Sequence, residues 1–297
     1  MWFGERRRGT MSTVAVVTDS TVSLPEDLLQ SLNIKTVAYY LHRGQEVLRD
    51  LITIQRDEFL RWLVTARVAP KTAAPGPGDY LETYEELAAA GAREIISIHM
   101  GAKLSAAFES ATAARRMLME RLPAVRVEVI DSRNAALCQG WMVVQAARQS
   151  LAGANLETIA AAVRKMVPIS HMIQTADTLR YLALGGRIGK AQALVGSMLH
   201  IKPLIGIEDG VIVPLGKTHT RHQAYAAMAD IAAGIIGKGK ARIGYLHAGA
   251  LQEAQKVKEL VEAKVQVIES MFGELSPALA VHTGPGMAGL CFYKVED

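Results

Sequence analysis

The chain has 297 residues, half of them hydrophobic, and carries a formal net charge of +4 at pH 7. This length exceeds the size at which one hydrophobic core usually stops growing, so the sequence predicts two domains. The first ten residues hold three arginines and one glutamate and contribute +2, which leaves the rest close to neutral. No basic stripe with interleaved aromatic residues is visible, so we expect no nucleic-acid partner.

The sequence predicts a cytoplasmic protein with no stable membrane insertion. No stretch approaches the roughly 18 apolar residues of a membrane span. Residues 2–10 have the charge of a signal-peptide start, but no apolar region follows, so the first ten residues read as a tail or a mis-assigned start. Cys138 and Cys291 lie far apart without a ligand pattern, and we expect buried thiols and no metal site.

The first half of the chain alternates predicted strands and helices. Strands are expected at 14–17, 34–41, 95–98 and 125–130, and helices at 53–66, 79–90, 105–121 and 134–152. A further helix is expected after the first strand, with Ser23 as its cap, Pro25 in its first turn and Glu26 completing a capping box. This alternation predicts a parallel sheet with helices on both faces.

The second half has a different pattern. Asn155 is expected to cap a helix that ends before Pro168, and Asp209-Gly210 between two apolar runs predicts a hairpin of strands 203–207 and 211–215. The remaining predicted segments are strands at 172–175, 242–246, 279–282 and 290–293 and helices at 177–184, 221–236 and 251–262. A hairpin among βα units predicts a mixed sheet. We therefore expect an N-terminal Rossmann-like α/β domain over 11–160 and a C-terminal α/β domain over 161–297.

Polar residues follow several predicted strands. They are Thr18, Asp19 and Ser20 after the first strand, His99 after the third, Asp131 and Ser132 after the fourth, His247, and His282 with Thr283. In open α/β sheets the carboxyl ends of the strands face the ligand crevice, so this pattern predicts where a site lies. Each residue taken alone is more typical of a helix cap or a turn than of a ligand site.

One glycine motif is misleading. Gly284, Gly286 and Gly289 fit G-x-G-x-x-G, but only eight residues follow Gly289, and they have the pattern of a strand. A dinucleotide site needs a strand before the motif, a helix after it and an acidic residue about twenty positions on. We therefore expect these glycines to serve tight turns or close backbone approach to a ligand.

An ordered set of short motifs resembles the DegV family of bacterial fatty-acid-binding proteins. Its members here are Val16-Val17-Thr18-Asp19-Ser20-Thr21, Lys71-Thr72-Ala73-Ala74-Pro75, Gly101-Ala102-Lys103-Leu104-Ser105, Asp177-Thr178-Leu179, Gly185-Gly186-Arg187-Ile188, Ile201-Lys202-Pro203 and His282-Thr283-Gly284-Pro285-Gly286. They span nearly the whole chain in the family's order. The resemblance implies two α/β lobes with a long-chain fatty acid between them, no cofactor and no catalytic residue.

The resemblance also implies roles for single residues. Thr72 and His282 match residues that meet the fatty-acid carboxyl group, and Arg187 matches an arginine of the head-group surface that faces a separate fatty acid kinase. A hydroxyl and an imidazole can both donate to a carboxylate, and an arginine attracts phosphate. Without the resemblance, Thr72 reads as a turn former, His282 as a core histidine and Arg187 as a helix C-cap.

The sequence departs from the family at Gly101 and Ala102, which replace two serines. The first of these serines usually offers a hydroxyl to the carboxyl group. We expect the backbone N–H of Gly101 or Ala102, or the His99 side chain, to take over this contact. On this hypothesis Gly101→Ser tightens fatty-acid binding.

Two alternatives stay open. The first is an enzyme acting on another small anionic ligand in the same crevice, with His99 and His247 as candidate acid/base groups. The second is a regulatory binding protein without a kinase. The sequence does not specify acyl length, saturation or oligomeric state.

Overall fold

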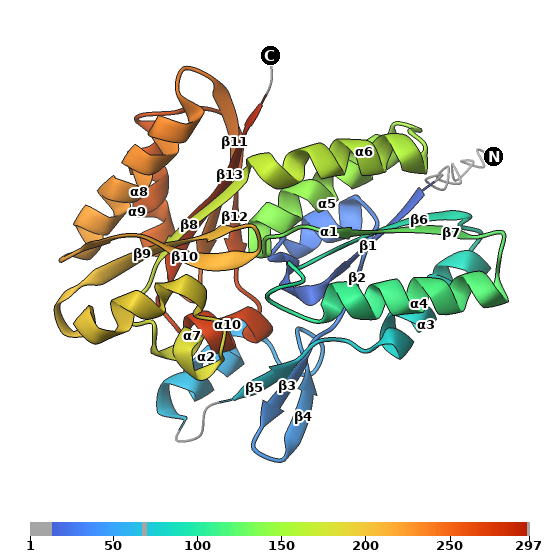
Figure 1. Ribbon diagram of the computed structural model, residues 1–297, viewed down its shortest axis with the longest axis horizontal. Coiled ribbons are helices and arrows are strands. Elements are labelled where there is room, and N and C mark those ends of the chain that lie inside the picture. The colour runs from blue at the N-terminus through green and yellow to red at the C-terminus, as the bar shows by residue number, and fades with distance from the viewer. Residues whose placement is uncertain (1–13, 67–69, 296–297) are drawn as a thin grey trace, which may run out of the picture.

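The computed structural model describes residues 14–66 and 70–295, apart from the side chains of 195–200. Residues 1–10, for which the sequence predicts a tail, lie outside this part. Two lobes lie side by side, each built on its own sheet, and a small third sheet lies beneath their junction (Figure 1).

The N-terminal lobe contains a four-stranded sheet in the order β2-β1-β6-β7, and all three strand pairs are parallel. Helices cover both of its faces, α3 and α4 on one and α5 and α6 on the other (Figure 1). The elements are β1 (Val14–Asp19), β2 (Ile34–Val37), β6 (Glu94–His99), β7 (Arg126–Asp131), α1 (Glu26–Ser31), α3 (Pro77–Ala89), α4 (Ala107–Arg121), α5 (Ala136–Leu151) and α6 (Leu156–Met166). The predicted parallel sheet is confirmed.

Two local predictions in this lobe are wrong. The expected strand 34–41 is divided into β2 and β3 (Tyr40–Arg43), which belong to different sheets. Ser23 does not cap α1, because it has a φ of 56° and its hydroxyl donates to the Thr21 carbonyl. The helix instead begins at Glu26, after Pro25.

The small sheet has the order β4-β3-β5 and is antiparallel. It consists of β3, β4 (Glu46–Arg49) and β5 (Lys71–Ala73), with α2 (Arg56–Thr65) in the same region. Neither β4 nor β5 was predicted. This sheet brings Thr72 toward the junction of the lobes (Figure 1).

The C-terminal lobe contains a six-stranded mixed sheet in the order β10-β9-β8-β13-β11-β12. Its elements are β8 (Ser170–Thr175), β9 (Lys202–Glu208), β10 (Val211–Thr218), β11 (Lys240–His247), β12 (Gln266–Glu274), β13 (Ala288–Val295), α7 (Arg180–Leu184), α8 (Arg221–Ile236), α9 (Leu251–Glu262), α10 (Pro277–Thr283) and a 3₁₀ segment, Gly189–His200. The predicted hairpin is confirmed, since β9 and β10 pair antiparallel around Asp209-Gly210.

The segment predicted as strand 279–282 is a helix. It forms most of α10, with Pro277 at the first helical position, where a missing N–H costs nothing. This helix carries His282 and lies at the junction of the lobes (Figure 1).

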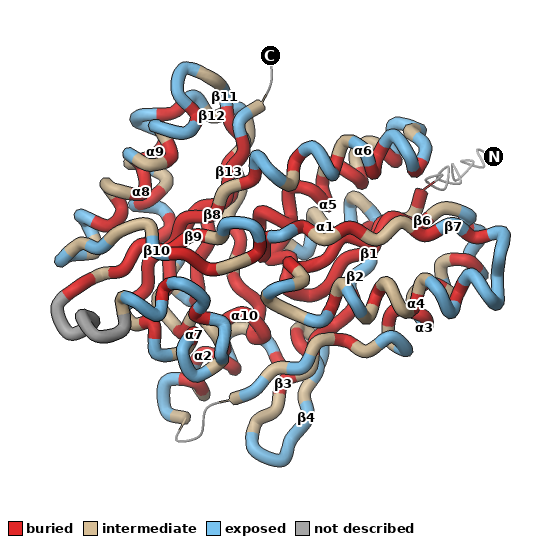
Figure 2. Tube along the Cα trace, viewed as in Figure 1, coloured by how far each residue is buried: buried red, intermediate tan, exposed pale blue. Residues whose placement is uncertain are grey.

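The lobes share buried contacts. One continuous apolar cluster joins residues of the first sheet, such as Val16, to residues of the second lobe, such as Met172 and Cys291. Buried segments run without interruption across the centre of the molecule (Figure 2). The predicted boundary after residue 160 falls inside α6, which packs on the N-terminal sheet. In the described ranges, no helix combines the length and the apolar character needed to cross a membrane.

Candidate functional site

A cavity of about 260 Å³ lies between the lobes. One wall comes from the carboxyl edge of the parallel sheet, because Tyr39 follows β2, Met100 follows β6, and Ala135 and Ala136 follow β7. The opposite wall is mostly apolar and comes from β8, β9, β10, α7, α10 and the segment that precedes α10. Its side chains are Met172, Gln174, Ile207, Ile212, Leu182, Leu275, Ala278 and Leu279. The carboxyl edge of the parallel sheet, where the strand-end pattern predicts a site, thus forms one wall of the cavity.

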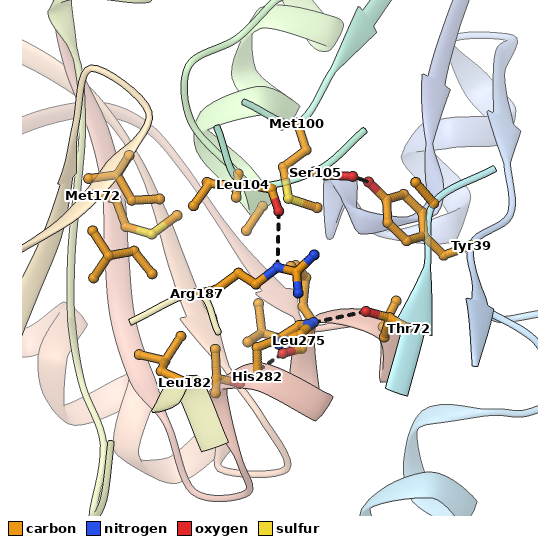
Figure 3. Close-up of a pocket in the computed structure, with 18 of the residues that line it drawn as sticks. Tyr39, Thr72, Met100, Leu104, Ser105, Met172, Leu182, Arg187, Leu275 and His282 are labelled. Carbon is orange, nitrogen blue, oxygen red and sulfur yellow. Dashed lines mark hydrogen bonds between the residues drawn. The ribbon is translucent and has the colours of Figure 1, made fainter. Parts of the chain in front are cut away.

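Thr72 and His282 meet at one end of this cavity, although 210 residues separate them. The Thr72 Oγ1 and His282 Nε2 atoms are 2.9 Å apart (Figure 3). Burial, together with the neighbouring Arg187 charge, lowers the pKa of His282 to about 4, so the ring is neutral at pH 7. If Nε2–H donates to Thr72, the threonine proton is free to donate to a ligand.

Arg187 lines the cavity between Leu104 and His282 (Figure 3), and it remains exposed to solvent. Its Nη1 donates to the Gly185 carbonyl over 2.7 Å, and its Nε lies 3.4 Å from the Leu104 carbonyl. The guanidinium is thus held by one residue from each lobe. An always-charged group at this position attracts an anion into a cavity that is otherwise largely apolar.

Gly185 allows His282 to occupy its place. A Cβ atom on Gly185 would lie only 2.2 Å from His282 Nδ1. Any larger residue would push the imidazole away from Thr72. The Gly185-Gly186-Arg187 motif therefore brings the end of α7 against His282 and directs Arg187 into the same space.

A second polar pair lies across the cavity from these residues. The Tyr39 hydroxyl is 2.5 Å from Ser105 Oγ, and both residues line the cavity (Figure 3). Burial raises the pKa of Tyr39 well above its usual value, so the phenol stays protonated. Sequence reasoning missed both residues as part of the cavity lining. Ser105 closes the Gly101–Ser105 motif, and Tyr39 carried no signal beyond its position near a strand end.

Asp19 and His99 belong to an interior network and do not line the cavity. The Asp19 carboxylate accepts from His99 Nδ1 and from the Met100 backbone N–H, each at 3.2 Å. His99 Nε2 is 2.6 Å from Ser97 Oγ, which accepts in turn from the Tyr84 hydroxyl. The order Asp–His–Ser resembles a hydrolase triad, but all three side chains are fully buried. The network instead fixes the segment that carries Met100.

His247 also lies outside the cavity lining. Its Nδ1 is 3.8 Å from Glu274 Oε1, and burial lowers its pKa. The two histidines considered as acid/base groups are therefore apart from the cavity where a substrate would bind.

Gly101 and Ala102 are not among the cavity-lining residues either. The Gly101 N–H donates to the Asn134 carbonyl at 2.8 Å, and the Ala102 N–H donates to the Asp131 carboxylate at 3.1 Å. Neither N–H is free for a ligand in this arrangement. A Cβ on Gly101 would lie 3.1 Å from the Arg133 carbonyl carbon. The geometry brings Thr72, His282 and Arg187 together but leaves these two residues aside.

The glycine motif near the C-terminus lies in an order opposite to that of a dinucleotide site. The helix α10 precedes it and the strand β13 follows it. A Cβ on Gly284 would lie 2.3 Å from the Tyr181 ring, and one on Gly289 would lie 2.7 Å from Gln174 Cβ. These glycines permit close packing inside the protein, and Gly284 and Gly286, each with a φ of 76°, form the tight turn that the sequence predicts.

The family model described as "Uncharacterised protein, DegV family" matches residues 13–295. This chain belongs to the DegV family. A DegV domain-containing protein of Streptomyces coelicolor is 33% identical, over 93% of this chain and 97% of its own. A relative from Clostridium acetobutylicum is 30% identical, over 96% of this chain and all of its own.

Solved structures of DegV proteins share the fold. The Thermus thermophilus protein, whose structure is described as showing fatty acid binding, has a TM-score of 0.88 and 29% identity, covering 95% of this chain and 99% of its own. DegV of Bacillus subtilis, described as a fatty acid binding protein, has a TM-score of 0.81 and 29% identity with the same coverage. The two-lobed α/β fold and the family resemblance are thus confirmed. In the part of the chain described, no cluster of His, Cys, Asp and Glu could hold a metal ion.

Proposed function

We propose that this chain holds one long-chain fatty acid in the cavity between its lobes, with the carboxyl group at Thr72 and His282. The observation that carries the proposal is the composition of the cavity. Its walls are mostly apolar, while a hydroxyl, a neutral imidazole and a guanidinium gather in one region. DegV relatives described as fatty-acid-binding proteins support the same assignment.

Both halves of such a ligand find suitable partners. Each buried methylene contributes about 0.8 kcal/mol, so a chain of roughly fifteen gains on the order of 10 kcal/mol before ordering costs. The carboxylate accepts from Thr72 and lies in the field of Arg187. A carboxylate beside His282 also favours the protonated imidazole, so ligand binding raises the pKa of this residue.

A head-group series tests this orientation. Palmitic acid, hexadecanol and methyl palmitate share an acyl length but differ in charge and hydrogen bonding. We expect palmitic acid to displace a fluorescent fatty acid with at least tenfold higher affinity than the other two, since hydrogen bonds to a charged group contribute about 1.5–3 kcal/mol. Equal affinities would show that the head group is not recognised and would refute the proposed pose.

We further propose that the protein presents the carboxyl group to a separate fatty acid kinase for acyl-phosphate formation. No phosphate-binding loop motif occurs in the sequence, so we expect no ATP turnover by the protein alone. With the kinase of the same organism, Arg187→Ala should lower the rate of acyl-phosphate formation more than it lowers fatty-acid affinity. Arg180→Ala, at an exposed arginine of α7, is the control. ATP turnover without the kinase would contradict this proposal.

A further inference from the structure

Asp50 is a buried carboxylate that lies behind the cavity rather than in it. It follows β4 directly, and its side chain is 1% exposed. Its backbone N–H donates to the Tyr39 carbonyl over 2.8 Å. It does not line the cavity between the lobes, although it borders a separate, smaller pocket together with Ser20 and Arg56.

The two carboxylate oxygens of Asp50 bind opposite walls of the cavity. Oδ2 accepts from Ser20 Oγ over 2.6 Å, and the same hydroxyl accepts from the Tyr39 N–H over 3.1 Å. Oδ1 accepts from the Ala278 N–H over 3.1 Å, across 228 residues of sequence. Tyr39 belongs to one cavity wall, and Ala278 belongs to α10 in the other.

Ala278 and His282 are one helical turn apart on α10, so both lie on the same face of this helix. A hydrogen bond that holds Ala278 in place therefore also holds the His282 side chain in position relative to Thr72. We propose that Asp50 is a positioning residue for the fatty-acid site, and that its carboxylate holds the α10 wall with His282 against the Tyr39 wall. This inference rests on the proposed function.

The ionised form of Asp50 is the one that suits these partners. A carboxylate only accepts, and it is approached by two donors, the Ser20 hydroxyl and the Ala278 N–H. A proton on either oxygen adds a donor that faces another donor, and so weakens the contact at that oxygen. Burial raises the pKa of Asp50 to about 6, while the Ser20 and Ser276 hydroxyls, the Ala278 N–H and the Arg56 charge oppose this rise. The Asp50 carboxylate therefore takes up a proton as the pH is lowered from 7 to 5.

The other charged and titratable groups around Asp50 are few. Arg56 of α2 faces it, and the Tyr39 phenol is near enough to feel its charge. Asp19 of β1 is directed away, toward His99 and Met100. His282, at the far end of α10, has its own pKa near 4 and titrates below the window of Asp50.

The free energy of unfolding of an Asp50 variant distinguishes a positioning role from simple structural support of the fold. The folded-state pKa of Asp50 lies above its unfolded value. The free energy of unfolding therefore falls as the pH rises from about 4 through about 6, because the folded protein has to give up the proton of a buried carboxyl group. Asp50→Asn removes that cost. We therefore expect the variant to be no less stable than the wild type at pH 7.5 and yet to bind fatty acid more weakly.

The test is the affinity for cis-parinaric acid, an intrinsically fluorescent 18-carbon fatty acid, measured from pH 7.5 to pH 5. We expect the ratio of the Asp50→Asn dissociation constant to that of the wild type to be about ten at pH 7.5, the value of one charge-assisted hydrogen bond, and to approach one at pH 5. Titration of the ligand itself cancels in this ratio. Asp230→Asn, which removes an exposed carboxylate paired with Lys264, should follow the wild type throughout.

Ser20→Ala provides a second variant. Since Ser20 lowers the pKa of Asp50, its loss should move the midpoint of the wild-type pH profile upward. A ratio of one at every pH for Asp50→Asn, with an unmoved midpoint in Ser20→Ala, would overturn the positioning role while leaving fatty-acid binding intact. Failure of the wild type itself to bind cis-parinaric acid would instead refute the proposed function.

Discussion

Two pairs of polar residues differ in how far the protein satisfies their hydrogen bonds. One pair is Asp19 and His99 in the interior of the N-terminal lobe, and the other is Thr72 and His282 in the cavity lining. The Asp19 carboxylate accepts from Thr21, His99, Met100 and Gln139 and is fully buried. His282 has one partner at Nε2, and among the described residues its Nδ1 has none. The first pair has its bonding capacity filled by the protein. The second pair faces a cavity with capacity left over.

This difference distinguishes residues that support the fold from residues that are available to recognise a ligand. A buried polar group that the protein satisfies stiffens the interior, and its loss costs stability. A polar group that the protein leaves partly unsatisfied at a cavity wall is available to a ligand, and its loss costs affinity. Substitutions in the two pairs should therefore affect different measurements.

The largest effect should come from Asp19→Asn, measured as stability. The change puts an amide in place of the carboxylate that accepts from His99 and from the Met100 N–H, and each buried donor left without an acceptor costs about 1–3 kcal/mol. Chemical denaturation should show this loss, with Asp230→Asn unchanged. Wild-type stability of Asp19→Asn would remove the distinction between the two pairs.

Thr72→Val and His282→Ala should show the opposite profile. Each removes a polar group from the cavity wall without opening the core, and each should weaken fatty-acid binding by about 1.5–3 kcal/mol with little change in unfolding. Competition against a fluorescent fatty acid measures the affinity. Unchanged affinity in both variants would return these residues to the roles of turn former and core histidine.

The pH dependence of the free energy of unfolding should also reveal the buried, neutral state of His282. Its folded-state pKa of about 4 lies below the unfolded value, so the folded protein binds fewer protons between pH 6.5 and pH 4. The contribution of His282 to stability is therefore present above pH 6.5 and lost as the pH falls through this window. His282→Gln should flatten this part of the stability profile. An identical profile in wild type and variant would contradict the buried, neutral state of the ring.

Gly185→Ala should give a smaller loss of affinity, about tenfold, or 1.4 kcal/mol. The new methyl group would displace the imidazole from Thr72 without deleting either side chain. Gly186→Ala is a nearby comparison, since no atom lies within 4 Å of a Cβ there, although its φ of 69° adds backbone strain. If Gly185→Ala binds as tightly as the wild type, the contact between Thr72 and His282 is not required.

Gly101→Ser should have the smallest effect, and its direction is the reverse of the sequence-based hypothesis. The added side chain meets the Arg133–Asn134 backbone and not the cavity. We expect equal or slightly weaker binding by the same competition assay. Tighter binding would show that the ligand reaches Gly101 and that the cavity extends further along this loop when occupied.

Local pattern predicted most of the elements but not the meeting of distant residues. The parallel sheet, the hairpin at Asp209-Gly210 and the carboxyl-edge location of the cavity followed from periodicity and turn residues. The break between β2 and β3 carries no glycine or proline, so 34–41 read as one strand. The short apolar run in α10 is too brief for a helical period to appear, although Pro277 marked its start.

The candidate site shows the same limit. Thr72 and His282 meet across 210 residues, and Asp50 meets Ala278 across 228, so no local pattern relates them. Only the family resemblance singled out Thr72, His282 and Arg187. The sequence predicted His99 as a polar strand end, but its burial by Tyr80 and Tyr84 depends on the packing of α3 against the sheet.

Native mass spectrometry of protein purified from cells tests the central claim most directly. The account predicts a complex that exceeds the mass of the chain by one long-chain fatty acid, released on denaturation and recovered by solvent extraction at one equivalent per chain. The same preparation of the Thr72→Val, His282→Ala double variant should carry much less. Repeated preparations that contain only the ligand-free mass, or a bound species without a carboxyl group, would contradict it.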